Sequence, residues 1–421
     1  MTATGRSARS RDVATLFVMR TIRMAAYGGL AIVLALYLVE IGLTEGQVGL
    51  LLAVTLAGDA VVSLLLTTRA DRLGRRPTPV VGAALMVLGG IVFVSTGEFV
   101  VLVAAAIVAV LSPSGNEVGP FLPVEQAALS EVIPGERRTL AFAWYQLAGS
   151  LATATGSLAA GVLVQVLIDG GSAAADAYRA VIGGYALLGL AIGLLGLTLS
   201  PAVEPPVRPA DASIRRRFGL HRSRRIVGEL SALFALDAFG GGFVVQSIVA
   251  LWFGLRWEVE PAALGGIFFG ANALAGLSGL VAARLAARIG LIETMVVTHI
   301  PSNVLLILVP LMPTVELAVA LLLVRFSISQ MDVPTRQSYT MAVVDPDERS
   351  AASGITGMAR SAGAAVAPLL ATPLVAAPIL GGGLPFVIAG TLKIGYDLAL
   401  WRRFRAERPP EERRPRPDGV A

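Results

Sequence analysis

The segment ADRLG at residues 70–74 recurs as AARIG at residues 286–290. Two further pairs lie at almost the same spacing, YGG at 27–29 with FGG at 239–241 and PGER at 134–137 with PDER at 346–349. The offset is 216 residues for the first pair and 212 for the other two. Three matches at nearly one offset indicate two duplicated halves, which are typical of secondary transporters.

The composition is that of a membrane protein. Of the 421 residues, 55% are hydrophobic and only 15% are charged, and the mean hydropathy is +0.73. Such a chain cannot cover its apolar surface with polar groups in water. Forty-six glycines and twenty-four prolines are tolerated in membrane helices, because neighbouring helices satisfy the freed backbone groups.

Several other classes of protein are disfavoured by what the sequence lacks. It has no cysteine, only two histidines, no GxxxxGK[ST] loop and no HExxH helix, so we expect no metal site, no cofactor and no enzyme activity. The arginines flank hydrophobic runs instead of forming one stripe, which argues against nucleic-acid binding. We expect a monomer whose partners are a small molecule, protons and the lipid bilayer.

Stretches of about 20 apolar residues predict twelve transmembrane helices, hence an all-α polytopic fold of two six-helix halves. The predicted spans are 13–39, 46–66, 78–97, 99–122, 139–167, 177–200, 228–254, 262–283, 292–313, 315–343, 350–378 and 383–402. They group into an N-terminal bundle at 1–200 and a C-terminal bundle at 228–405. A cytoplasmic linker at 201–227 and a cytoplasmic tail at 406–421 complete the chain.

The charges of the connections predict the orientation. Arginines cluster in the even-numbered connections and acids in most odd-numbered ones, so the positive-inside rule places both termini in the cytoplasm. Both halves then start on the same side, and the repeat is parallel. The arginine-rich, cysteine-free composition suggests a bacterium, so we expect a location in a bacterial inner membrane.

The loop after span 2 resembles a signature of a known family. TTRADRLGRR at 67–76 is similar to the GxLaDRxGRR motif of the major facilitator superfamily, although Thr67 stands where the family usually has glycine. The resemblance implies a 6+6 fold and a cytoplasmic gating latch at Asp71, Arg72, Gly74, Arg75 and Arg76. The alternative is that these arginines only set the topology.

Small residues in two spans bear on the direction of transport. ATATGSLAAG at 152–161 resembles a degraded antiporter pattern of the family, and GAAVAP at 363–368 in span 11 is a parallel version. Simple helix packing explains both runs equally well.

Charged residues at membrane depth are functional candidates by default. The acids Asp237, Glu117, Asp59 and Asp332 are candidates for proton coupling, Asp237 first because the following GGG run at 240–242 would let span 7 bend. By family analogy spans 1, 4, 7 and 10 line the cavity, and the substrate-cavity candidates are Tyr27, Arg23, Asn116, Gln246, Arg325 and Arg360. Static pairs, such as Asp332 with Arg336, are the alternative. Glu125 and Arg336 are placed nearer the cytoplasmic mouth, as gates or as snorkelling side chains.

These features predict a secondary transporter that works by alternating access and exports small organic molecules in exchange for protons. A proton-coupled importer of a small metabolite is one alternative. A non-transporting receptor or assembly protein that kept the fold is the other.

Overall fold

The computed structural model describes residues 3–116, 119, 121–133, 135–204, 222–345 and 348–405. Within its helices, the side chains of residues 3–9, 67–73, 135–140, 283 and 350 are not described. The described residues form helices and contain no strand. Both predicted cytoplasmic segments lie largely outside this part, since residues 205–221 and 406–421 are not described.

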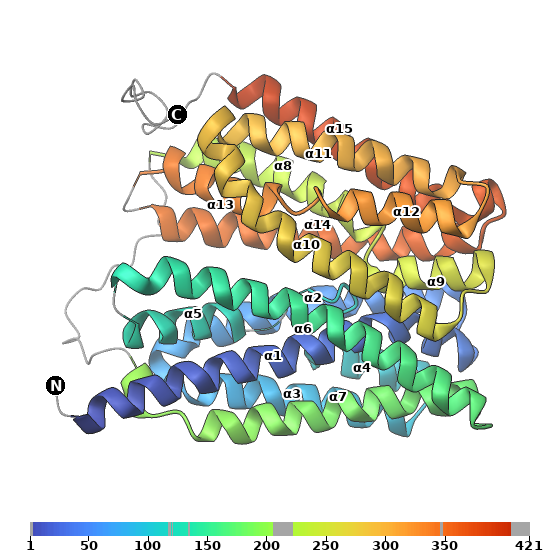
Figure 1. Cartoon of the computed structure of the whole chain (residues 1–421), viewed down its shortest axis with the longest axis horizontal. Helices are drawn as coiled ribbons and strands as arrows, with labels where there is room; N and C mark the ends of the chain where they lie inside the picture. Colours follow the sequence, from blue (N-terminus) through green and yellow to red (C-terminus); the bar gives the residue numbers. More distant parts are fainter. Residues whose placement is uncertain are drawn as a thin grey trace.

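The described residues of the first half form seven α-helices and one short 3-10 helix. They are α1 (Ala3–Glu40), α2 (Glu45–Leu73), α3 (Pro77–Ser95), α4 (Phe99–Val108), α5 (Phe121–Val132), α6 (Gly135–Asp169), α7 (Ala174–Leu197) and η1 (Pro201–Val203). Helices α4 and α5 together make predicted span 4. In Figure 1 this half forms the lower layer.

In the second half, the part of the chain that the structure describes forms eight α-helices. They are α8 (Arg224–Gly242), α9 (Gln246–Trp257), α10 (Pro261–Ile289), α11 (Leu291–Leu308), α12 (Val315–Phe326), α13 (Asp332–Val343), α14 (Arg349–Ala376) and α15 (Leu384–Phe404). The short helices η3 (Val309–Leu311) and η4 (Ile379–Gly382) join them. Span 7 corresponds to α8 with α9, and span 10 to α12 with α13.

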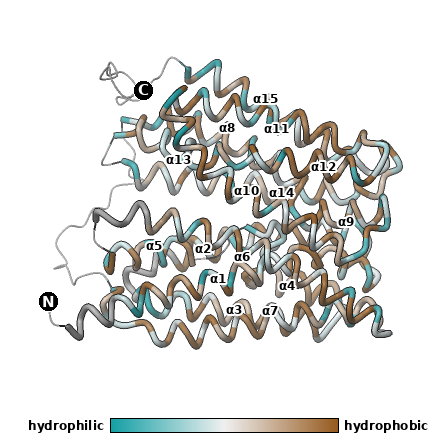
Figure 2. Tube along the Cα trace, in the orientation of Figure 1, coloured by the Kyte–Doolittle hydropathy of each residue, from teal (hydrophilic) through white to brown (hydrophobic). Residues whose placement is uncertain are grey.

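Ten described helical segments are long and apolar enough to cross a membrane, and the α8–α9 pair counts as one of them. The other two predicted spans are the broken pairs α4–α5 and α12–α13, whose pieces are individually too short. Ten segments and two broken pairs account for the twelve predicted spans. Figure 2 shows that the helices are mainly hydrophobic along their middles and that hydrophilic stretches gather near their ends.

Three of the four spans expected around the cavity are interrupted. In span 4, Pro113 removes a backbone donor and Gly115 adopts a φ of +67°, a conformation that favours glycine. In span 7 the helix ends at the glycine run, and Val245 is extended before α9 begins. Each break turns the following half-helix, so its side chains face directions that a continuous helix would not give them.

Small residues bring helices into close contact inside each half. A Cβ on Gly156 of α6 would lie 1.9 Å from the backbone oxygen of Ala25 in α1, and one on Gly28 would lie 2.1 Å from that of Thr153. In the second half, a Cβ on Gly363 of α14 would lie 2.3 Å from the oxygen of Ala235 in α8. The small-residue runs of spans 5 and 11 are therefore packing surfaces.

The halves meet along three helix pairs: α6 with α10, α2 with α14, and α1 with α9. We call the end where α1 begins and α15 ends the proximal end, on the left of Figure 1, and the other the distal end. Gly161 packs on the backbone of Pro261 and Gly265, and Ser247 donates to the oxygens of Ala31 and Pro113. These contacts lie in the distal part, whereas the proximal half-helices α5, α8 and α13 pack mainly within their own halves.

Candidate functional site

Asp237 of α8 is the centre of the largest buried ionic cluster that the described residues form. Its side chain is 3% exposed, and Lys393 Nζ of α15 lies 2.5 Å from Oδ1. The other oxygen of Asp237, Oδ2, accepts hydrogen bonds from Arg360 of α14 at 2.9 Å and from Arg336 of α13 at 3.2 Å. A buried carboxylate is stable only when it is paired and hydrogen-bonded, and here three cations from three other helices do so.

The cluster continues outward on two sides of Asp237. Arg336 also binds Asp332, one helical turn away, at 2.7 Å. On the other side, His299 of α11 places Nε2 3.9 Å from Asp237 Oδ1 and Nδ1 2.8 Å from Asp397 Oδ1 of α15. Asn303 donates to the second oxygen of Asp397 at 3.3 Å.

We call this set the C-half network; it comprises Asp237, His299, Asn303, Asp332, Arg336, Arg360, Lys393 and Asp397. Its three carboxylates are balanced by three cations, and His299 is the remaining titratable ring. Most of its members are buried, but the side chain of Arg360 is 34% exposed. Arg360 therefore connects the interior of the network to the molecular surface.

A second cluster lies in the first half. Arg23 of α1 binds Glu125 of α5 through two hydrogen bonds of 2.6 and 2.7 Å, and both side chains are fully buried. The hydroxyl of Tyr145 in α6 donates to the same carboxylate. Arg20 donates to the backbone oxygen of Tyr145 and to Gln146, each at 2.9 Å. These five residues are the N-half cluster.

The two clusters occupy equivalent places with opposite polarity. Arg23 and Asp237 stand 214 positions apart, and Glu125 and Arg336 stand 211 apart, close to the repeat offset of the sequence. The first half thus pairs a base on span 1 with an acid on span 4, and the second half pairs an acid on span 7 with a base on span 10. In each half a residue of the next span, Tyr145 or Arg360, binds the carboxylate.

Gln246, the first residue of α9, joins the two halves. Its amide donates to Ser157 of α6 at 3.2 Å and accepts from Asn272 of α10 at 3.1 Å. Asn116, in the break of span 4, is exposed, and Tyr27 is buried with its ring 6.4 Å from that of Tyr185.

Arg325 is placed differently from the other deep arginines. It is the penultimate residue of α12, in the middle of span 10, with its guanidinium carbon 4.9 Å from the ring centre of Phe326. Among the described residues no carboxylate forms an ion pair with it. A cation with that environment is suited to contact a polar or anionic part of a substrate, and it stays a substrate-cavity candidate.

The other three proton-coupling candidates, Glu117, Asp59 and Asp332, differ in where they lie. Glu117 lies outside the described residues. Asp59 is partly buried in α2, a helix that supplies no member of either cluster. Asp332 does form the pair with Arg336 that was considered as a static alternative.

The gating motif is described only in part, because the side chains of Asp71 and Arg72 are not described. Gly74 has a φ of +100°, and the following backbone amides of Arg75 and Arg76 donate to the carboxylate of Glu204 at 2.7 and 3.0 Å. The Arg75 guanidinium donates to Glu131 at 3.2 Å. All of these partners belong to the first half.

One prediction from the sequence needs correction. Glu125 and Arg336 were considered as gates or as snorkelling side chains nearer the cytoplasmic mouth, but both are buried and paired, so neither snorkels to a surface. A gating role for them stays a prediction.

Sequence reasoning missed four members of the network, His299, Asn303, Lys393 and Asp397, because they lie in spans 9 and 12, outside the four cavity spans. A signal was present: Lys393 is the only lysine of the chain, His299 is one of two histidines, and all four residues interrupt apolar stretches.

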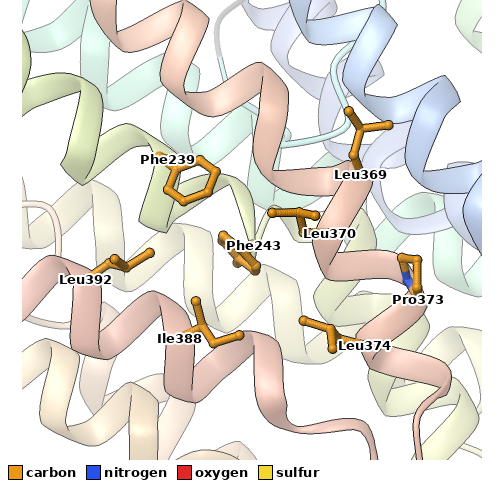
Figure 3. Close-up of a pocket in the computed structure, with 8 residues that line it drawn as sticks. All are labelled: Phe239, Phe243, Leu369, Leu370, Pro373, Leu374, Ile388 and Leu392. Carbon is orange, nitrogen blue, oxygen red and sulfur yellow. The ribbon is translucent and has the colours of Figure 1, made fainter.

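An apolar pocket of about 500 Å³ lies beside the network, between α8, α14 and α15 (Figure 3). Its lining is Phe239, Phe243, Leu369, Leu370, Pro373, Leu374, Ile388 and Leu392. Phe239 follows Asp237 by two positions and Leu392 precedes Lys393, so α8 and α15 carry apolar and ionic side chains close together in sequence. With no polar lining side chain, the pocket offers no partner to a charged ligand.

The model of the Major Facilitator Superfamily matches residues 16–368. The chain belongs to this superfamily. Its helices, broken spans and parallel repeat are therefore those of a multi-pass membrane transporter and not of an enzyme.

Comparison with individual members supports the same fold. The chain is 29% identical to the Saccharomyces cerevisiae protein "Uncharacterized membrane protein YJR124C", over 93% of each chain. A bacterial homologue of the human lysosomal transporter Spinster superposes with a TM-score of 0.72 at 17% identity, covering 95% of this chain and 98% of that one. A D-xylose–proton symporter superposes with a TM-score of 0.71 at 16% identity, covering 93% of this chain and 97% of that one.

Proposed function

We propose that this superfamily member is a proton-coupled secondary transporter of small organic molecules. It would work by alternating access in a bacterial inner membrane, with both termini in the cytoplasm. The observation that carries the proposal is the C-half network, in which a buried and charge-balanced set of side chains joins a titratable ring to a partly exposed arginine.

The balance of the network gives proton binding a structural consequence. One added proton leaves the set with a surplus positive charge in a poorly solvated interior, where an unpaired charge is unfavourable by several kcal/mol. Breaking one of the contacts to Asp237 relieves the surplus, and those contacts join α8, α13, α14 and α15. Protonation would therefore favour a different packing of these helices.

The contacts between the halves indicate where the halves would separate during transport. Distal contacts such as Gly161 on Gly265 and Ser247 on Pro113 would have to separate when the distal end opens. Each ionic cluster is confined to one half, so the halves can rock without breaking either cluster.

The test of coupling is Asp237→Asn in everted membrane vesicles with an imposed pH gradient, against a panel of compounds selected in a growth screen. We expect gradient-driven accumulation to be lost in the variant. Asp176→Asn is the matched control, because Asp176 is an exposed acid paired only with Arg179 at the distal end of the bundle. If Asp237→Asn drove uptake as well as the parent, the coupling assignment would be wrong.

Export is the direction that we propose, because the runs at 152–161 and 363–368, besides packing helices together, resemble the antiporter pattern of the family. In everted vesicles an exporter accumulates its substrate when the lumen is acid. Accumulation in right-side-out vesicles under an inward proton gradient would instead identify an importer. A parent protein that moved no compound and bound another protein tightly would identify a receptor.

A further inference from the structure

We propose that the proton-binding group of this transporter is His299, held in place by Asp397 and Asn303. Asp237, which lies between the ring and Arg360, transmits the effect of the charge on the ring to that arginine. This inference rests on the proton coupling proposed above, and it moves the site from the predicted acid to a ring on span 9.

The geometry around the ring fixes which nitrogen is free to bind the proton. Nδ1 lies 2.8 Å from Asp397 Oδ1, so in the neutral ring it carries the hydrogen that this carboxylate accepts. Asn303 binds the other oxygen of Asp397 and so orients the carboxylate toward the ring. Nε2 is then the basic nitrogen, and it faces Asp237 Oδ1 at 3.9 Å.

The titratable and charged groups around His299 come from four helices. Asp397 and Tyr396 of α15 and Asp237 of α8 lie against the ring. Lys393 of α15, Arg336 of α13 and Arg360 of α14 lie one contact further away, on Asp237. Asp237 is in contact with all three cations, so it is the one group through which a charge on the ring changes the environment of Arg336, Arg360 and Lys393 together.

Asp237 itself is poorly suited to carry the proton. Protonating it would leave three cations around a neutral acid, whereas protonating His299 places the new charge between two carboxylates. Imidazole is also the side chain whose ordinary titration falls near neutral pH. Asp237 is therefore a positioning and relay residue in this arrangement.

The ring can be observed without knowing the substrate, because the chain has only two histidines. His221, the other one, lies outside the described residues, and His221→Gln leaves His299 as the only source of an imidazole signal. Nitrogen-15 NMR of this protein in lipid bilayers, labelled at histidine, reports the tautomer and the protonation state at each pH.

We expect the neutral ring to be the Nδ1–H tautomer and Nε2 to gain a proton reversibly as the pH is lowered across the range in which the protein stays folded. Asp397→Asn should weaken proton binding by about tenfold, since it removes the carboxylate that stabilises the charged ring. Asp176→Asn should leave the titration unchanged. If His299 keeps one protonation state over this range in the His221→Gln protein, whose network is intact, the proposal is overturned. This outcome does not depend on whether Asp397→Asn folds.

Transport measurements separate this inference from the proposed function. If the parent shows no dependence on a pH gradient, proton coupling itself fails. If the parent is coupled and His299→Gln keeps the same coupling and the same pH profile, only the assignment to His299 fails. The expected result is that His299→Gln loses gradient-driven accumulation and retains exchange of the identified compound across the membrane.

Discussion

Glu125 is the residue whose buried ion pair should contribute most clearly to the stability of the fold. Its carboxylate receives both Arg23 nitrogens and the Tyr145 hydroxyl, with no exposure to solvent. Glu125→Gln leaves a buried arginine without its counter-charge, so we expect the free energy of unfolding to fall by about 3–5 kcal/mol. Denaturant titration in detergent micelles measures the loss.

Glu131 provides the control for this experiment on the same helix. It pairs with Arg75 at the proximal end, where its side chain is 35% exposed. Exposed pairs contribute about 0–1 kcal/mol, so Glu131→Gln should change stability little. Equal losses in the two variants would contradict the distinction between buried and exposed pairs.

At the scale of helices, the contact between α1 and α6 depends on glycine. A methyl group on Gly156 would meet the backbone oxygen of Ala25, which cannot rotate away as a side chain could. Gly156→Ala should therefore lower the unfolding free energy by about 1–3 kcal/mol through overpacking. Gly183→Ala on α7 is the matched control, because no atom lies within 4 Å of its added methyl group. It should be neutral or slightly stabilising.

The helices themselves were predictable because hydrophobic length is a local property of the sequence. The bend of span 7 followed from the glycine run, whereas span 10 was predicted as one continuous helix and is interrupted between Phe326 and Asp332. The pairing of side chains was not predictable in the same way. It depends on the rotation of each half-helix after its break, and so the burial of Glu125 and Arg336 was missed.

For the molecule as a whole, the contacts between the halves should hold them together without the linker. The halves pack along α6 with α10, α2 with α14 and α1 with α9. Residues 1–212 and 213–421 expressed as two chains should therefore copurify when only one carries an affinity tag. Recovery of the tagged half alone would show that these contacts are too weak to hold the molecule together.

The arrangement also predicts which residues share a side of the membrane. The chain has no cysteine, so each introduced thiol is read without background. Thr198→Cys and Arg288→Cys, at exposed proximal positions, should react with an impermeant reagent from one side, and Glu98→Cys and Ser172→Cys from the other. Labelling of Thr198→Cys and Arg288→Cys from opposite sides would contradict the parallel repeat.

The inverted polarity of the two ion pairs has a consequence for the ancestry of the chain. Had the duplicated gene already encoded such a pair, reversing it in one copy a single codon at a time would have left a buried charge unpaired or facing a like charge at the first step. The simplest history is an ancestor with neutral side chains at both positions, followed by independent acquisition of charge in each descendant copy. In that history, the two halves of this protein acquired their different charges only after the duplication had joined them.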